Sequence, residues 1–299
     1  MTNLYIDSPL DDAARRQRLY AGDVFVYSPT AASLEFCEFA RRMIREAFAG
    51  RDPEHAQHDM PVAEFAAVLA ELKPRFIHHP ESKRLIRAML LAHGCSGQDT
   101  YFDVPRLRSS TSNGYLTTGI AYAFHPHRDT WYSAPLCQLN WWMPVFDVAP
   151  DNVVAFHPQH WDQPLANSSA GYDYQRWNAT SRFDAAKHIG TDTREQPKPL
   201  EPVAAEPDFR IVAPVGGVMI FSGAQLHSSV PNTSGRTRYS IDFRTVHRGD
   251  AEAFHGAPNV DSRCTGTSMS DYLQVDDQSN LPAALVEAYL PGHPQPVRQ

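Results

Sequence analysis

The chain has 299 residues, with 27 Lys and Arg against 34 Asp and Glu, so its formal net charge is -7. This length allows a full hydrophobic core, and the acidic balance without a basic block disfavours nucleic acid and anionic membranes as partners. Acids and arginines fill the N-terminal stretch MTNLYIDSPLDDAARRQRLYAG, and no later run reaches the ~20 apolar residues of a membrane span. We therefore expect a soluble, cytoplasmic protein whose four scattered cysteines are free, mostly buried thiols.

The first hundred residues have the periodicity of helices. A short apolar strand candidate at 23–27 is followed by apolar residues at helical spacing over 28–50, 61–73 and 80–93. Gly50 and Gly94 stand where the first and last of these helices should end. Residues 1–100 are thus predicted to be a mainly helical part that packs on a core formed by the rest of the chain.

After residue 100 the pattern changes to short β-rich runs divided by Pro, Gly, Asn and Asp. A mainly β fold with flanking helices is predicted, in which 101–250 form a double-sheet jelly roll or barrel within a single domain, 1–299. The predicted strands are 101–108, 115–125, 136–146, 152–157, 209–213, 217–222, 224–230 and 237–247.

Residues 158–208 interrupt this β pattern with a polar, proline-rich segment that contains several aromatic residues, Trp161 among them. A connection of this length is too long for a plain turn, and such loops commonly serve as active-site lids. A flexible insertion without a role is the alternative, and it suits the part after Asp192 better. Residues 251–299 are predicted to be a C-terminal extension that ends in a disordered tail, 291–299.

The motif FHPHRDTW places His125, His127 and Asp129 at every second position. Side chains with this spacing share one face of an extended chain. Pro126 has no N–H to donate to a neighbouring strand, which favours a strand end or a sheet edge. The sequence therefore predicts that an imidazole and a carboxylate meet at the rim of a sheet, where a metal ion can bind.

A third ligand is expected from a distant part of the chain. The segment 213–246 favours His227, because a Gly-Gly turn leads into an apolar strand and a short loop then turns back with His227 at the start of the next strand. Two histidines and one carboxylate with open positions form the facial triad of non-haem Fe(II) oxygenases. The other candidates are His157, His160, His188, His247 and His255.

A second polar pattern follows in RTRYSIDFR. Arg238, Ser240 and Asp242 fall on one face of the predicted strand, opposite Tyr239 and Ile241. A buried guanidinium needs an anionic partner, and its planar fork suits a carboxylate, with the Ser240 hydroxyl as an additional donor. A dicarboxylic cosubstrate would meet this requirement. The alternative is that Arg238 pairs with Asp242 or another acid of the protein.

With HRD at 127–129, GGVMIFSGAQLHSS containing His227, and RTRYSIDFR, the chain resembles the Fe(II)/2-oxoglutarate dioxygenases, specifically the phytanoyl-CoA/ectoine hydroxylase-like branch. The resemblance covers about 115–246. It implies a double-stranded β-helix (cupin-like) core, Fe(II) bound by the two histidines and Asp129, and the distal carboxylate of 2-oxoglutarate held by Arg238 and Ser240. It also implies consumption of O2, release of succinate and CO2, and hydroxylation, desaturation or cyclisation of a substrate. Asp129 argues against halogenation, because the related halogenases have a small residue at that position.

Other residues are assigned to the predicted site only from the direction in which their side chains are expected to point. Gln138, Asn140 and Trp142 share one face of the strand after the HRD motif, and buried polar groups there need partners such as the cosubstrate or the substrate. If that face is exposed to solvent, they have no role. His125 is a candidate neighbour of the metal ligands or substrate contact, with a structural role as the alternative, and Trp161 is a candidate substrate contact in the lid.

The predicted function is therefore oxygenation of a small metabolite or natural-product intermediate, bound between the lid and the mouth of the barrel. One alternative is a cupin-like metal-dependent isomerase or hydrolase that does not use 2-oxoglutarate. Another is a non-catalytic binding module on the same fold. A small-molecule partner is expected, and the sequence indicates nothing about oligomeric state. Zn(II) or Ni(II) would bind such a ligand set more tightly than Fe(II).

Overall fold

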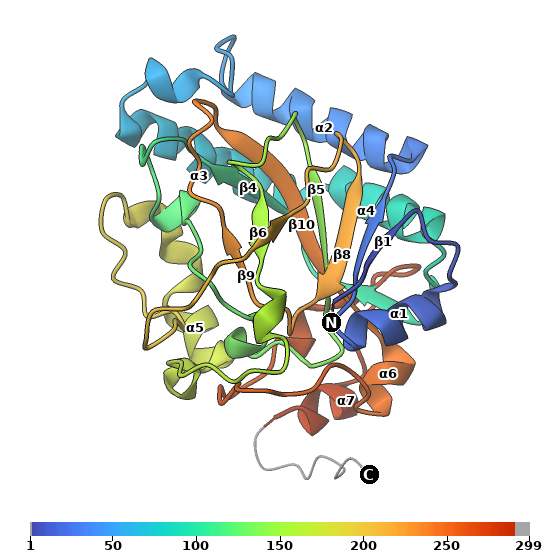
Figure 1. The fold of residues 1–299 in the computed structure, drawn as a ribbon. Helices are drawn as coiled ribbons and strands as arrows, with labels where there is room; N and C mark the ends of the chain where they lie inside the picture. The colour runs from blue at the N-terminus through green and yellow to red at the C-terminus, as the bar shows by residue number, and fades with distance from the viewer. Residues whose placement is uncertain (1, 291–299) are drawn as a thin grey trace.

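The computed structural model describes residues 2–290, and the tail at 291–299 that was predicted to be disordered lies outside the described residues. Within the described part, eight strands form a larger sheet and three form a smaller one (Figure 1). The larger sheet has the order β1 (Leu4–Ile6), β2 (Val24–Tyr27), β8 (Val218–Ser222), β5 (Leu139–Pro144), β10 (Arg238–His247), β3 (Thr100–Phe102) and β11 (Leu273–Gln274), with β4 (Arg106–Ser110) also paired to β10. The smaller sheet has the order β7 (Phe209–Arg210), β6 (Val154–Phe156) and β9 (His227–Ser229).

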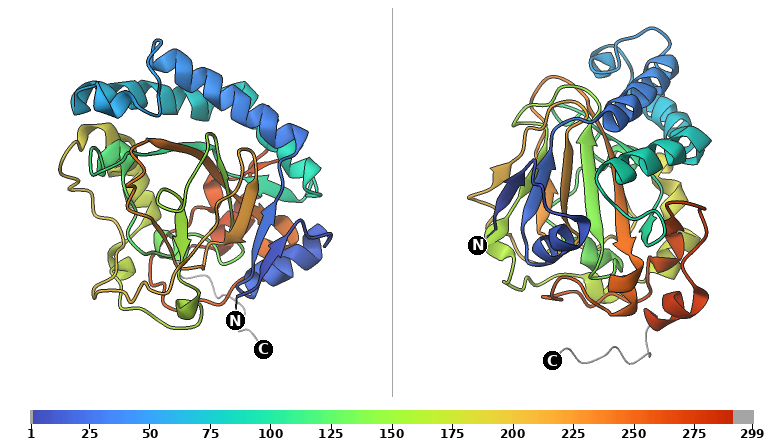
Figure 2. Two further views of the ribbon diagram at one scale, coloured as in Figure 1. Left: turned by 45° about the horizontal axis from the view of Figure 1, so that its top comes forward. Right: turned by 90° about the vertical axis from the view of Figure 1, so that its right-hand side faces the viewer.

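Helices cover the outer face of the larger sheet. Trp141, Ile220 and Ile241 point to this face and belong to the main hydrophobic core, which includes the buried sides of the N-terminal helices. Figure 2 shows these helices on one side of the larger sheet and the smaller sheet on the other. The α-helices of the described residues are α1 (Asp12–Tyr20), α2 (Ala31–Ala47), α3 (Val62–His78), α4 (Pro80–Ala92), α5 (Tyr174–Thr180), α6 (Arg248–Glu252) and α7 (Ala283–Ala288), of which α5 belongs to the 158–208 insertion rather than to this layer.

The inner face of the larger sheet carries both apolar and polar residues. Trp142, Phe221 and Phe156 form a second, smaller core between the two sheets. Directly opposite residues of antiparallel strands share a face. The registers therefore place Arg238, Ser240, Asp242 and Arg244 of β10 on the same inner face as Asn140 and Trp142 of β5 and Arg106 and Arg108 of β4.

The predicted β core of jelly-roll type with flanking helices is confirmed. Strands were correctly predicted at 136–146, 152–157, 209–213, 217–222, 224–230 and 237–247. Each observed strand lies within its predicted range and is shorter than that range. The predicted strand 101–108 is divided into β3 and β4 by the Val104-Pro105 segment. The helix predicted to end at Lys73 continues to His78 through Pro74.

The strand predicted at 115–125 is wrong. This segment forms turns and a short 3-10 helix, Gly119–Ala121. Gly119 has a φ of +58°, and a Cβ atom there would lie 2.4 Å from the Ala185 carbonyl oxygen. The segment thus leaves the extended conformation at Gly119 and packs closely against the backbone of the 158–208 insertion.

No helix among the described residues is both long and apolar enough to cross a membrane.

Candidate metal centre

His127 and His227 are held next to each other by the backbone. The two residues form an isolated antiparallel bridge, in which the His127 N–H donates to the His227 carbonyl over 2.9 Å and the His227 N–H donates back over 3.0 Å. His227 is the first residue of β9, so this bridge extends the edge of the smaller sheet. The two imidazole centroids lie 4.3 Å apart.

Backbone carbonyls also set the orientation of both rings. His127 Nδ1 lies 2.9 Å from the His125 carbonyl oxygen, and His227 Nδ1 lies 2.9 Å from the Gln225 carbonyl oxygen. A carbonyl only accepts, so each Nδ1 carries the proton and each Nε2 keeps a lone pair. Metal-binding histidines commonly have this arrangement, in which the second nitrogen donates to a carbonyl or carboxylate.

Asp129 begins the 3-10 helix η3 (Asp129–Tyr132), directly after the His127 bridge. Its Oδ2 accepts a hydrogen bond from Gln138 Nε2 at 3.0 Å and lies 3.4 Å from Arg244 Nε. Gln138 is fixed in turn by the Tyr272 hydroxyl, which donates to Gln138 Oε1 over 2.8 Å. These donors occupy Oδ2 and leave Oδ1 directed at the two imidazoles.

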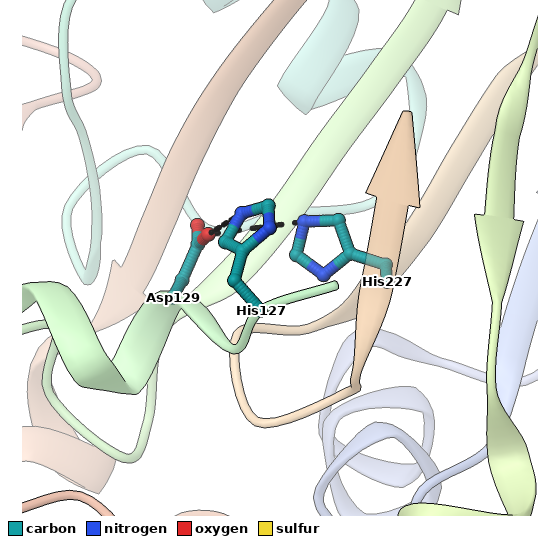
Figure 3. A group of neighbouring side chains, drawn as sticks. All are labelled: His127, Asp129 and His227. Carbon is teal, nitrogen blue, oxygen red and sulfur yellow. Dashed lines mark ion pairs between the residues drawn. The ribbon is translucent and has the colours of Figure 1, made fainter. Parts of the chain in front are cut away.

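The three side chains converge on one point (Figure 3). Asp129 Oδ1 lies 3.4 Å from His127 Nε2 and 3.8 Å from His227 Nε2, and all three side chains are buried. Bonds of about 2.1 Å to one ion place its ligand atoms roughly 3 to 3.5 Å apart, for either octahedral or tetrahedral angles. The residues present therefore fit a divalent transition-metal ion with little movement.

The electrostatics keep Asp129 and His227 in the forms that bind metal. Burial raises the pKa of Asp129, but the Arg244 guanidinium and the two neighbouring histidines lower it, and together they hold that pKa well below its usual range. Burial lowers the pKa of His227 to about 3, and the neighbouring His127 acts in the same direction. A carboxylate and a neutral imidazole are the species that a metal requires.

Arg238 is buried on the same inner face without an acidic partner. Its Nη1 donates to Ser240 Oγ over 2.6 Å, its guanidinium lies 5.6 Å from the centre of the Trp142 ring, and its Nε has no hydrogen-bond partner. Among the described residues, no ion pair joins Arg238 to a carboxylate. The alternative partner considered from the sequence, Asp242, is instead bound by Arg108 through two hydrogen bonds of 2.9 and 3.2 Å.

Positive charge exceeds negative charge around Arg238. Arg108 and Lys73 are its cationic neighbours, and Asp242 is the carboxylate that opposes all three. Burial lowers the pKa of Arg238 to about 10 and that of Lys73 to about 7, with Arg108 acting in the same direction on both. A buried, undercompensated cation is costly, so this region favours an anion from outside the chain.

Of the remaining predicted residues, Asn140 and Trp142 contact residues of this centre, whereas the side-chain hydrogen bonds of His125 and the close contact of Trp161 are with other segments. Asn140 accepts a hydrogen bond from Gln138 through its Oδ1 at 2.9 Å, and Trp142 lies under Arg238 in the inter-sheet core. His125 turns toward the insertion, with Nε2 3.0 Å from the Pro197 carbonyl and Nδ1 3.2 Å from the Tyr122 hydroxyl. Trp161 packs on Gly22, where a Cβ atom would lie 2.6 Å from the indole ring.

Several residues of the centre were missed by the sequence reasoning. Arg244 follows Asp242 by two positions in β10, so the same alternation that grouped Arg238, Ser240 and Asp242 predicts its place on the inner face. Lys73 and Tyr272 have no comparable signal. Lys73 reaches in from α3, where its Nζ donates to the Ile120 carbonyl, and Tyr272 comes from the C-terminal extension.

No family model matches this chain, and no curated protein matches it. Among solved structures, the chain is similar to the epimerase SnoN in complex with Fe3+, alpha ketoglutarate and nogalamycin RO, with 16% identity, 79% of this chain and 85% of that chain covered, and a TM-score of 0.42. It is also similar to EvdO2 from Micromonospora carbonacea var. aurantiaca complexed with 2-oxoglutarate (12% identity, 81% and 93% covered, TM-score 0.45). A third is AviO1 from Streptomyces viridochromogenes Tue57 (15% identity, 85% and 99% covered, TM-score 0.40).

Proposed function

We propose that this protein is a non-haem Fe(II)/2-oxoglutarate-dependent oxygenase of the phytanoyl-CoA/ectoine hydroxylase-like branch, acting on a small metabolite or natural-product intermediate. The single observation that carries the proposal is the buried Arg238 guanidinium, which no carboxylate of the described chain neutralises, on the sheet face that also leads to a His–Asp–His centre. A metal-dependent isomerase or hydrolase needs the centre but leaves this cation unexplained.

Each group of the chain has a defined part in this proposal. His127 Nε2, His227 Nε2 and Asp129 Oδ1 would hold Fe(II), and Arg238 with Ser240 would hold the distal carboxylate of 2-oxoglutarate. Ser240 Oγ accepts from Arg238, so its own proton remains available to donate to that carboxylate. When bound, Fe(II), 2-oxoglutarate and O2 together supply a strong oxidant, and succinate and CO2 are released.

The 158–208 insertion is proposed to be the lid that excludes water. The Tyr132 hydroxyl donates to the Pro197 carbonyl over 3.1 Å, and the Tyr132 ring lies 5.5 Å from the Tyr172 ring of the insertion and 5.6 Å from His127. A substrate that enters between the insertion and the centre therefore meets Tyr132 and Tyr172. Closure over the site protects a reactive oxidant from water.

Asp129 bears on the reaction outcome. Its carboxylate fills the ligand position that a halide would need, and its Oδ2 is anchored by Gln138. This arrangement favours hydroxylation, or desaturation or ring closure after a second hydrogen abstraction, over halogenation.

The test is anaerobic addition of Fe(II) and then 2-oxoglutarate to the metal-free protein, followed by oxygen and a panel of candidate substrates. We expect a visible charge-transfer band when 2-oxoglutarate binds the iron, and succinate formation that rises with the correct substrate. Iron binding without any 2-oxoglutarate binding would overturn the proposal in favour of a metal-dependent isomerase, hydrolase or binding module.

A further inference from the structure

The segment 257–275, called the C-terminal strap here, lies between the metal ligands and the insertion. The Ser268 N–H donates to the Ser133 carbonyl over 3.1 Å, just after η3. On its other side, the Thr265 N–H donates to the Tyr172 carbonyl of the insertion over 2.9 Å. In Figure 1 the orange-red strap runs below the green and yellow segments that carry η3 and the insertion. The strap is thus in backbone contact with both.

Arg128, between the ligands His127 and Asp129, points away from the metal and into this junction. Its guanidinium is buried, and it donates to the Ala224 carbonyl over 2.6 Å and to the Gln163 carbonyl of the insertion over 3.1 Å. The carboxylate that pairs with it is Asp261 of the strap, whose Oδ2 lies 3.2 Å from Arg128 Nε. Asp261 is the one acidic partner of Arg128 within residues 2–290, and a buried cation of this kind depends strongly on such a partner.

Asp261 connects three segments through a single carboxylate. Its Oδ2 accepts from Arg128 and from the Leu165 N–H of the insertion at 3.0 Å, and its Oδ1 accepts from Trp131 Nε1 of η3 at 2.7 Å. Its carbonyl also accepts from Asn167 Nδ2 at 3.0 Å. The Asp261 side chain is only 4% exposed, so water cannot replace these bonds if the carboxylate is lost.

We infer that Asp261 is a positioning residue, which fixes the Arg128 and Trp131 side chains so that His127 and Asp129 keep their metal-binding geometry and the insertion stays docked on them. The inference rests on the proposed metal-dependent function. The Asp261 side chain bonds to Arg128, directly before Asp129, and to Trp131, two residues after it, and it acts on the metal ligands through these two residues. Residues that orient metal ligands from outside typically change metal affinity roughly 10- to 100-fold when mutated.

The decisive variant is Asp261→Asn, which keeps the shape but replaces one acceptor oxygen by a donor NH2 that faces the Arg128, Trp131 or Leu165 donors. We expect Co(II) affinity, titrated without oxygen, to fall roughly 10- to 100-fold. The Co(II) absorption spectrum should change, and the 158–208 insertion should be cleaved faster by protease. Asp271→Asn is the matched control. It makes the same change in the same strap, but Asp271 pairs with Arg182 and Tyr174 of the insertion, so Co(II) affinity should be unchanged.

Wild-type Co(II) affinity and spectrum in a folded Asp261→Asn protein would overturn the inference. If Asp261→Asn does not fold, Asp261→Glu is measured instead, because it keeps the charge but displaces the carboxylate by one methylene. Wild-type Co(II) affinity in Asp261→Glu would likewise overturn the inference. An equal loss of Co(II) affinity in Asp271→Asn would also overturn it, because the effect would then belong to the strap in general. A wild-type protein that binds Co(II) and Fe(II) but does not bind 2-oxoglutarate would overturn the proposed function and leave the Asp261 result standing.

Discussion

Replacing Arg238 by methionine removes the guanidinium that we assign to 2-oxoglutarate and keeps a side chain of similar length. Hydrogen bonds to charged groups contribute about 1.5 to 3 kcal/mol each, so losing a two-bond contact with a carboxylate should cost at least about 3 kcal/mol. At 1.36 kcal/mol per tenfold change, 2-oxoglutarate affinity should fall by a factor of at least roughly 100, with metal affinity unchanged. The measurement is an anaerobic titration of the Fe(II)-loaded protein with 2-oxoglutarate.

Stability distinguishes this role from a structural one. Arg238 has no carboxylate partner among the described residues and an unpaired Nε, so Arg238→Met should leave the free energy of unfolding of the metal-free protein unchanged or raise it by about 1 kcal/mol. Arg108→Met is the matched control, because it strips Asp242 of its two-bond partner and should lower that free energy by about 1 to 2 kcal/mol. A large loss of stability in Arg238→Met with unchanged 2-oxoglutarate affinity would refute the reasoning.

Gln138→Leu removes the donor to Asp129 Oδ2, so Co(II) affinity should fall roughly 10-fold, and an unchanged affinity would show that this hydrogen bond does not orient the ligand. Burial lowers the pKa of His227 to about 3 in the folded protein, whereas a histidine of the unfolded chain has a pKa near 6.5. Between these two pH values the unfolded chain therefore binds more protons than the folded protein. The free energy of unfolding of the metal-free protein should therefore decrease as pH falls from about 6.5 toward 3, and His227→Gln should make this dependence shallower. Burial raises the pKa of three thiols to about 12, so the folded protein at pH 8 should react with a thiol reagent at no more than the partly exposed Cys264, whereas all four cysteines should react after denaturation. The three protected thiols are Cys37, Cys95 and Cys137.

The strands within 136–157 and 209–247 could be predicted from the sequence, because period-2 alternation and turn residues occur together there. The apolar run before His227 and the return into RTRYSIDFR fix both the strands and the face that each residue takes. The conformation of 115–125 could not be predicted, because its apolar residues suggest a strand, whereas a close backbone contact at Gly119 sets its actual backbone path. Such a contact depends on the distant 158–208 insertion, which has no periodicity of its own.

The candidate ligands were found by spacing, but the local structure differs from the one that the spacing assumed. An extended chain through His127 and Asp129 was expected, whereas the structure has a backbone bridge at His127 followed at once by the 3-10 helix η3. Asp129 therefore approaches the histidines from a loop. The supporting roles of Tyr272 and Asp261 left no trace in the local sequence, because each comes from the C-terminal extension and meets the centre only through the path of the folded chain.

The bridge between His127 and His227 has a consequence for how the centre tolerates substitution. The mutual placement of the two imidazoles is encoded in main-chain hydrogen bonds, which do not depend on the identity of any third donor. The acidic donor sits on a separate turn with its own anchors, so substitutions there leave the histidine pair intact. A different side chain at position 129 can thus be accommodated while the two imidazoles keep their mutual placement.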